Sequence, residues 1–158
     1  MSFLWTTFWG KVLLTFLFSM SPILELRGSI PLAVAHGLPP AVAIPVAILG
    51  NTIPVPFVIL FIRRIFSWIR RHAPRLNRMV DRLEEKGKNK KDVIQKSVFW
   101  GLFLLVAIPL PGTGAWTGSL VAAMLDMRLK RAFPAIFLGL LAAGAIVAFV
   151  SYGVASFF

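Results

Sequence analysis

Residues 21–31 read SPILELRGSIP, which brings two prolines, a glycine and two opposite charges into an otherwise apolar stretch of the chain. Proline removes a backbone hydrogen-bond donor and clashes with the preceding turn, and glycine weakens a helix further. A second interruption of this kind, PLPGTGAWTG, occupies residues 109–118. The sequence therefore predicts that two apolar segments break within their length, at residues 21–31 (the first break) and at residues 109–118 (the second break).

The composition around these breaks is that of an integral membrane protein. Of the 158 residues, 58% are hydrophobic, against about 45–50% in a typical soluble domain. Four apolar stretches are each long enough for a membrane helix, which needs about 20 residues. They lie at about residues 3–24, 38–62, 97–125 and 132–158. The composition disfavours a soluble fold.

The two halves of the chain resemble each other around the breaks. RGS at residues 27–29 lies over TGS at residues 117–119, and AIPVAILG at residues 43–50 lies over AFPAIFLG at residues 132–139. Chance similarity of short apolar strings is the alternative. Matched interruptions in two halves are typical of transporters built from repeats.

The basic residues distinguish two topologies. Of the 17 Lys and Arg residues, 12 lie in residues 63–96 and three more in residues 126–131. If all four stretches cross the membrane, these two regions fall on opposite faces. If each broken segment instead enters and leaves by one face, 15 of the 17 are cytoplasmic, as the positive-inside rule favours. We therefore expect an all-α integral membrane fold, an inverted repeat of a re-entrant helical hairpin plus a transmembrane helix, with both termini outside.

The expected organisation has three parts. The first half covers residues 1–62, with a hairpin at about 3–37 and a transmembrane helix at about 38–62. The second half covers residues 97–158, with a hairpin at about 97–127 and a transmembrane helix at about 132–157. Between them, residues 63–96 form a basic amphipathic segment, interrupted at Pro74, that we expect on the cytoplasmic leaflet as an anchor and orientation signal.

Glu25 and Arg27 are the acid and the base of the first break. Ionisable groups at membrane depth are costly and usually mark a route for substrate or protons. The fork of donors on Arg27 suits phosphate or carboxylate, whereas Glu25 could bind a cation or take up a proton. The alternative is that the two side chains pair with each other, or lie at the interface, and hold the loop.

The second break offers glycines for close backbone approach, threonine hydroxyls and an aromatic surface, although small residues and threonines also serve helix packing. Asn51 lies inside an expected span, where a hydrogen bond to a hairpin is the natural use of its amide. The expected substrate-binding residues are Glu25, Arg27, Gly28, Thr113, Gly114, Trp116, Thr117 and Gly118, with Asn51, Pro22, Pro31 and Pro111 as supporting residues.

The sequence lacks the residues that several classes of function require. It has no cysteine, no Ser/His/Asp set, no paired carboxylates at a break, no phosphate loop and no histidine cluster. We therefore expect neither an enzyme, nor a metal site, nor a cofactor, with proton coupling as the one option. Nucleic acid as a partner does not explain the apolar stretches that flank the basic residues.

At PILELRGSIP (residues 22–31) and PLPGTGAWTG (residues 109–118) the sequence resembles the putative small multidrug export protein family, over nearly the whole chain. That family is similar in turn to the DedA/VTT (SNARE-associated) superfamily, whose members have paired re-entrant hairpins and are associated with moving lipids, including a polyprenyl phosphate carrier. The resemblance implies a bacterial or archaeal plasma membrane. DedA proteins also carry arginines in the second hairpin, whereas here Thr117 lies opposite Arg27.

These observations favour a transporter or flippase that moves a lipid phosphate or another amphipathic small molecule, held between the two hairpin tips. A small multidrug exporter of lipophilic cations is one alternative, and a membrane scaffold that transports nothing is another. Membrane lipids are expected partners. Because so short a chain shields only a modest polar site, we also expect a homo-oligomer.

Overall fold

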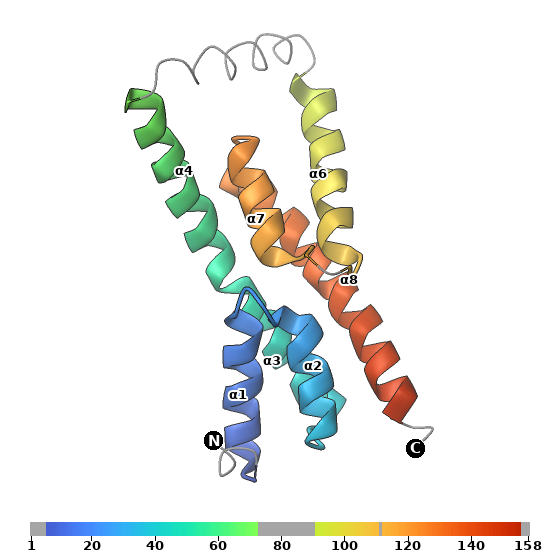
Figure 1. Cartoon of the computed structure of the whole chain (residues 1–158). Coiled ribbons are helices and arrows are strands. Elements are labelled where there is room, and N and C mark those ends of the chain that lie inside the picture. The colour runs from blue at the N-terminus through green and yellow to red at the C-terminus, as the bar shows by residue number, and fades with distance from the viewer. Residues whose placement is uncertain (1–5, 73–90, 111, 156–158) are drawn as a thin grey trace.

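The structure, a computed structural model, describes residues 6–72, 91–110 and 112–155. These residues form helices and their connections, with no strand among them (Figure 1). The helices are α1 (Phe8–Met20), α2 (Glu25–Ala35), α3 (Pro40–Thr52), α4 (Pro54–His72), α6 (Lys91–Ala107), α7 (Ala115–Met124) and α8 (Leu129–Ala155). The expected all-α fold is thus confirmed for the described residues. Much of the basic segment, including Pro74, lies outside them.

Two helical stretches are long and apolar enough, by length and composition, to cross a membrane: Pro40–Ile65 and Leu129–Gly153. The first is made of α3 and the start of α4, which meet at Ile53 just before a proline. Both stretches fall on the expected transmembrane helices, and they fit a membrane protein. Since α4 runs on to His72, the helix does not end where the basic segment begins.

Each expected break separates two short helices. α1 and α2 pack together as a first hairpin around residues 21–24, and α6 and α7 pack as a second hairpin around residues 108–114. Both breaks are confirmed, but they are narrower than predicted. Gly28 and Pro31 lie inside α2, and Thr117 and Gly118 lie inside α7. A proline costs a helix one hydrogen bond and some strain, which the full burial of Ile30 and Ala33 on either side of Pro31 offsets.

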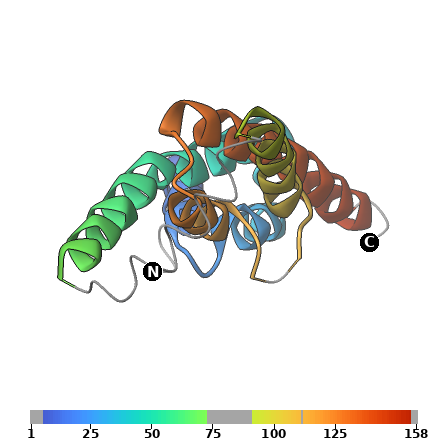
Figure 2. The same cartoon turned by 90° about the horizontal axis from the view of Figure 1, so that it is seen from above.

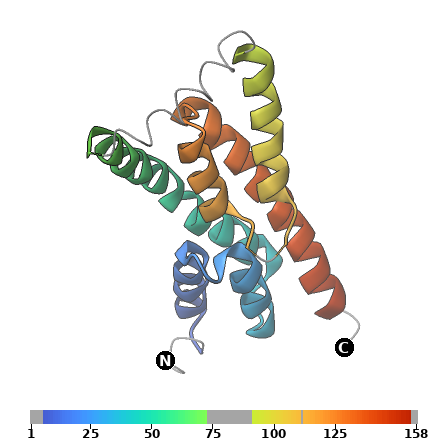
Figure 3. The ribbon, with the colours of Figure 1, turned by 45° about the horizontal axis from the view of Figure 1, so that its top comes forward.

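The two hairpins lie at opposite ends of the molecule, and their connecting turns meet between them (Figures 1 and 3). The first turns of α1 and the last turns of α8 share one end, whereas the end of α4 and the start of α6 share the other. Seen from above, α4 and α8 extend to opposite sides (Figure 2).

The helix contacts come in matching pairs. α1 packs on α3 as α6 packs on α8, and α4 packs on α7 as α8 packs on α2. Two glycines allow the closest of these approaches. A Cβ on Gly50 would lie 2.6 Å from the Phe16 carbonyl oxygen in α1, and one on Gly139 would lie 2.7 Å from the Val106 Cβ in α6. Each long helix therefore packs tightly on the first helix of its own hairpin.

Candidate functional site

The turns of the two hairpins are joined by the side chain of Arg27. From the first turn of α2, its guanidinium crosses to the second hairpin and donates to the Leu110 carbonyl oxygen. Its Nη2 also donates to the Thr113 hydroxyl at 3.0 Å and approaches the Ile108 carbonyl oxygen at 3.4 Å. The Nε of Arg27 is buried and has no hydrogen-bond partner among the described residues. Arg27 therefore holds the loop of the second hairpin, and its buried Nε–H stays unused.

Glu25 reaches the same loop from its other side. Its side chain is 6% exposed, and its Oε1 accepts a hydrogen bond from the Trp116 backbone N–H at 3.2 Å. Trp116 lies in the first turn of α7, and Gly114, the N-cap residue of that helix, supplies no side-chain cap. The carboxylate thus caps α7 from the first half of the chain, where the helix dipole favours a negative charge.

The backbone around this contact is unusual on both sides. Glu25 has a φ of 48°, which is uncommon for a residue other than glycine. Gly114 has a φ of 150° with a ψ of −163°, and a Cβ on it would overlap the Glu25 carboxylate. Conformations of this kind persist where the surroundings impose them, often at functional sites. Only glycine at position 114 leaves room for the carboxylate of Glu25.

Glu25 and Arg27 do not form an ion pair. Within the described ranges the one salt bridge joins Arg63 and Asp126, whose Nη2 and Oδ1 are 2.5 Å apart. The sequence left open that Glu25 and Arg27 neutralise each other. In the structure each instead bonds to the second hairpin. We call these two residues, with residues 108–116 opposite them, the tip junction.

Three further residues of the second break shape the junction. The single hydroxyl hydrogen of Thr113 is shared between the Ile108 and Leu110 carbonyl oxygens, which lie 3.0 and 2.9 Å from its Oγ1. Thr117 donates to the Gly112 carbonyl oxygen at 2.9 Å. The indole Nε1 of Trp116 donates to the Met20 carbonyl oxygen at 3.2 Å, which ties α7 to the end of α1. These side chains hold the loop itself in place.

Asn51 bonds to a hairpin, as the sequence predicts. The amide orientation that satisfies its neighbours donates to the Ser19 carbonyl oxygen at 3.1 Å and accepts from the Leu26 N–H at 3.2 Å. One side chain therefore serves the last turn of α1 and the first turn of α2. Beside it, the hydroxyls of Ser19 and Ser29 are 2.5 Å apart, and all three residues are fully buried. The sequence analysis missed Ser19 and Ser29, although a serine within an apolar helix is a sequence signal of a buried polar contact.

The remaining expected site residues lie away from the junction or serve packing. A Cβ on Gly118 would be 2.7 Å from Val106 Cγ2 in α6, and one on Gly28 would be 2.9 Å from Leu24 Cδ2. Pro22 and Pro31 are exposed, and Pro111 lies outside the described residues. No group of three metal-ligating side chains occurs in the part of the chain that the structure describes. What the tip junction offers is a buried carboxylate, a guanidinium and a flat aromatic ring.

A family model described as "Putative small multi-drug export protein" matches residues 25–146. The match includes Glu25, Arg27 and all of residues 108–118. No curated protein and no solved structure matches the chain.

Proposed function

We propose, because this chain belongs to the putative small multi-drug export protein family, that it is a membrane transporter that exports small lipophilic cations bound at the tip junction. Glu25 provides the negative charge of the site, and we assign the aromatic face to the indole of Trp116, whose backbone N–H bonds to Glu25. Aromatic faces attract organic cations, most strongly where water is excluded. The proposal concerns transport, and it includes no chemical change of the substrate.

The observation that carries this proposal is the unequal use of the two charges at the junction. Arg27 already donates to two carbonyl oxygens and to a hydroxyl. Glu25 accepts one hydrogen bond through Oε1, and its Oε2 has no partner among the described residues. A buried carboxylate with an unused oxygen gains more from an added cation than a guanidinium with most donors satisfied gains from an added anion. The site therefore favours a cation.

The lengths of the short helices support a re-entrant topology. α1 has 13 residues and α7 has 10, so at 1.5 Å per residue they rise about 20 and 15 Å, each well short of a bilayer core of about 30 Å. The two hairpins point from opposite ends toward a common junction (Figure 1). We propose that each hairpin enters and leaves by one face, that the halves are inverted copies, and that the tip junction lies near the midplane, with the basic segment cytoplasmic.

Transport then requires that the two hairpins separate at the tip junction. When the hairpins separate on one side, the bonds of Glu25 and Arg27 to the second hairpin open, and the carboxylate faces that side. Exchange of a cation for a proton at Glu25 returns the carboxylate to an uncharged state between loads. This exchange would couple export to proton entry.

One observation favours a second candidate, a flippase for a lipid phosphate. The Nε of Arg27 is buried without a partner in the described part of the chain, and an unused Arg donor at membrane depth suits one phosphate oxygen. This reading makes Arg27 the binding residue and gives Glu25 only its capping role at α7.

Equilibrium dialysis of the purified protein in detergent separates these readings, with tetraphenylphosphonium as the cationic probe and dodecyl phosphate as the anionic probe. We expect Glu25→Gln to weaken binding of the cation at least about tenfold, or about 1.4 kcal/mol. The amide oxygen of Gln can still accept from Trp116. Asp126→Asn, which removes a carboxylate elsewhere, should leave the affinity unchanged.

Two other outcomes decide against the cation exporter. If dodecyl phosphate binds and Arg27→Gln abolishes it, while Glu25→Gln has no effect, the lipid phosphate reading holds. If neither probe binds a correctly folded protein, the chain acts as a scaffold.

Labelling of single cysteines in cells tests the topology, because the chain has no cysteine of its own. A membrane-impermeant reagent should label Thr7→Cys from outside and leave Lys130→Cys untouched. The reverse pattern would exclude the proposed orientation.

A further inference from the structure

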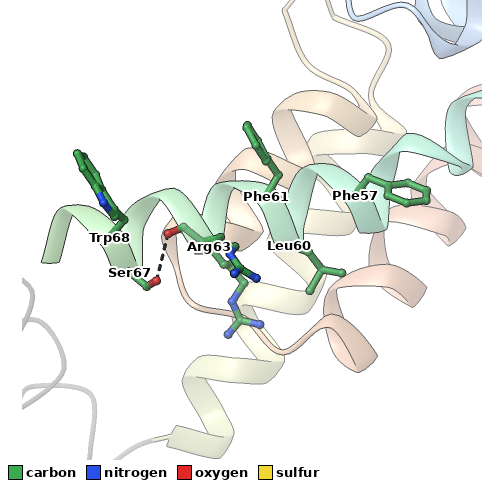
Figure 4. A pocket seen from close by; sticks show the side chains of 7 residues that line it. Phe57, Leu60, Phe61, Arg63, Ser67 and Trp68 are labelled. Atoms are coloured by element: carbon green, nitrogen blue, oxygen red, sulfur yellow. Dashed lines mark hydrogen bonds between the residues drawn. The ribbon is translucent and has the colours of Figure 1, made fainter. Parts of the chain in front are cut away.

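α4, which is marked in Figure 1, carries a groove outside the tip junction, and Figure 4 shows the side chains that line it. Its volume is about 860 Å³. One end is apolar, lined by Phe57, Leu60 and Phe61, which are 70%, 53% and 67% exposed. Monomeric soluble proteins rarely expose an apolar patch of this kind without a binding role, and in a membrane such a surface faces acyl chains.

The other end of the same groove is cationic. Arg63, Arg64 and Ser67 line it, together with Trp68, which is 62% exposed. Figure 4 shows Arg63 and Ser67 on the same stretch of helix as the apolar residues, one to two turns further along. The groove therefore changes from apolar to cationic along the direction of α4.

The two arginines differ in how they are held. Arg63 donates from Nε and Nη2 to Asp126 Oδ1, at 3.1 and 2.5 Å, and this ion pair fixes it against the connection between α7 and α8. The guanidinium of Arg64 has no hydrogen-bond or ion partner among the described residues. Arg63, held in place by Asp126, and the unpaired Arg64 together offer an anion two guanidinium groups, of which Arg64 keeps its full charge.

The change of character coincides with the end of the candidate span. That span ends at Ile65, so the aromatic end of the groove lies at acyl depth and the arginines lie where headgroups begin. Tryptophan is enriched at this level of membrane proteins. Basic pockets on the cytoplasmic side of spans, with apolar surface beneath, suit anionic headgroups.

We propose that this groove binds an anionic phospholipid, with its phosphate at Arg64 and Arg63 and its acyl chains over Phe57, Leu60 and Phe61. Free phosphate would leave the apolar end without a partner. A second copy of the chain packed groove to groove would oppose two arginines to two arginines, because a two-fold contact brings the same residues together. A lipid satisfies both ends at once.

Native mass spectrometry of the full chain, titrated with phosphatidylglycerol or with phosphatidylcholine in detergent, tests this site. We expect phosphatidylglycerol to bind more tightly, and Arg64→Ala to weaken it about fivefold, which corresponds to about 1 kcal/mol for one basic residue at an anionic surface. Arg64→Lys should retain most of the affinity. Arg128→Ala is the matched control, since it removes an exposed arginine from the connection between α7 and α8 and should have no effect.

Three results would overturn the proposal. The first is an equal loss in Arg64→Ala and Arg128→Ala, which would indicate net charge alone. The second is displacement of the lipid by millimolar inorganic phosphate. The third is efficient disulfide formation between two Phe61→Cys chains, which would assign the groove to a second copy. Because none of these measurements involves tetraphenylphosphonium, their failure leaves the proposed export function untouched.

Discussion

The two hairpins end in different ways, although they occupy matching places in the two halves. The turn of the first hairpin is capped from within its own half, since Asn51 of α3 bonds to Ser19 in α1 and to Leu26 in α2. The loop of the second hairpin is capped from the opposite half, by Arg27 at Leu110 and by Glu25 at Trp116. The first hairpin therefore has a capping residue within its own half, with one added bond from Trp116 to Met20, whereas the second relies on Glu25 and Arg27 of the first.

This difference accounts for the uneven distribution of polar residues between the halves. In the register that places AIPVAILG over AFPAIFLG, Leu140 stands where the first half has Asn51. Both side chains are fully buried, so an amide in one half is replaced by a hydrocarbon in the other. Helix ends at membrane depth find no water to bond. The charges of the first break thus do for the second hairpin what Asn51 does for the first.

The largest effect should come from closing the space that the Glu25 carboxylate occupies. Gly114→Ala places a Cβ on that carboxylate at a φ of 150°, and we expect it to lower the free energy of unfolding in detergent by about 3 kcal/mol. Gly112→Ala is the control, because its φ is 83° but its Cβ would meet no atom within 4 Å. Gly112→Ala should lower the free energy of unfolding by about 1 kcal/mol. Equal losses would mean that the second hairpin does not depend on Glu25.

Asn51→Leu makes the first half resemble the second. It should lower the free energy of unfolding by about 2 kcal/mol, because two buried backbone groups lose their partner. Hydrogen exchange should accelerate at the end of α1 and the start of α2, and it should stay unchanged in α6 and α7. Thr52→Val removes only a hydroxyl that bonds Ile48 within its own helix, and we expect a change within about 0.5 kcal/mol. Faster exchange in both hairpins would contradict the independent capping of the first.

The matched glycines of the two breaks should respond unequally to alanine. A Cβ on Gly118 meets Val106 of the neighbouring helix, so Gly118→Ala should cost about 1–2 kcal/mol through overpacking. A Cβ on Gly28 meets the flexible side chain of Leu24, and the helix propensity gained, about 1 kcal/mol, offsets the contact. Thermal unfolding of the two variants side by side measures the difference. Equal shifts would mean that α7 packs no more tightly than α2.

The smallest effect should come from the contact between the halves that lies far from the tips. Asp126→Asn removes the ion pair with Arg63, whose side chain is 30% exposed against 60% for Asp126. We expect a loss below about 1 kcal/mol that disappears at high salt. Asn also tolerates the φ of 49° at this position. A loss as large as that of Gly114→Ala would show that the halves are held together at this end as firmly as at the tips.

The sequence predicted the parts of the fold that depend on local chemistry. Proline and glycine located both helix breaks, and the apolar runs located the two candidate spans. The prediction was wrong about the extent of the breaks, because burial of the neighbouring residues keeps α2 helical through Pro31. The fit of Asn51 against a hairpin was predictable because a buried amide needs partners.

The cross-connections between the hairpins were not predictable. Arg27 bonds to backbone carbonyls at Ile108 and Leu110, more than 80 positions away in the chain. A carbonyl is present at every residue, so the sequence carries no sign of which one will be used. For the same reason the sequence left open that Glu25 and Arg27 pair together. The role of these residues in binding a substrate stays a prediction.

The self-contained capping of the first hairpin also bears on how the chain is made. Domains and segments generally fold in the order of their synthesis, so in the proposed topology α1, α2 and α3 enter the membrane before residues 97–158 are made. Asn51 arrives with α3 and can bond Ser19 and Leu26 at that moment, whereas the Met20 carbonyl oxygen gains its bond only when Trp116 follows. The second hairpin, which brings no such residue of its own, reaches the bilayer when Glu25 and Arg27 are already there to receive it.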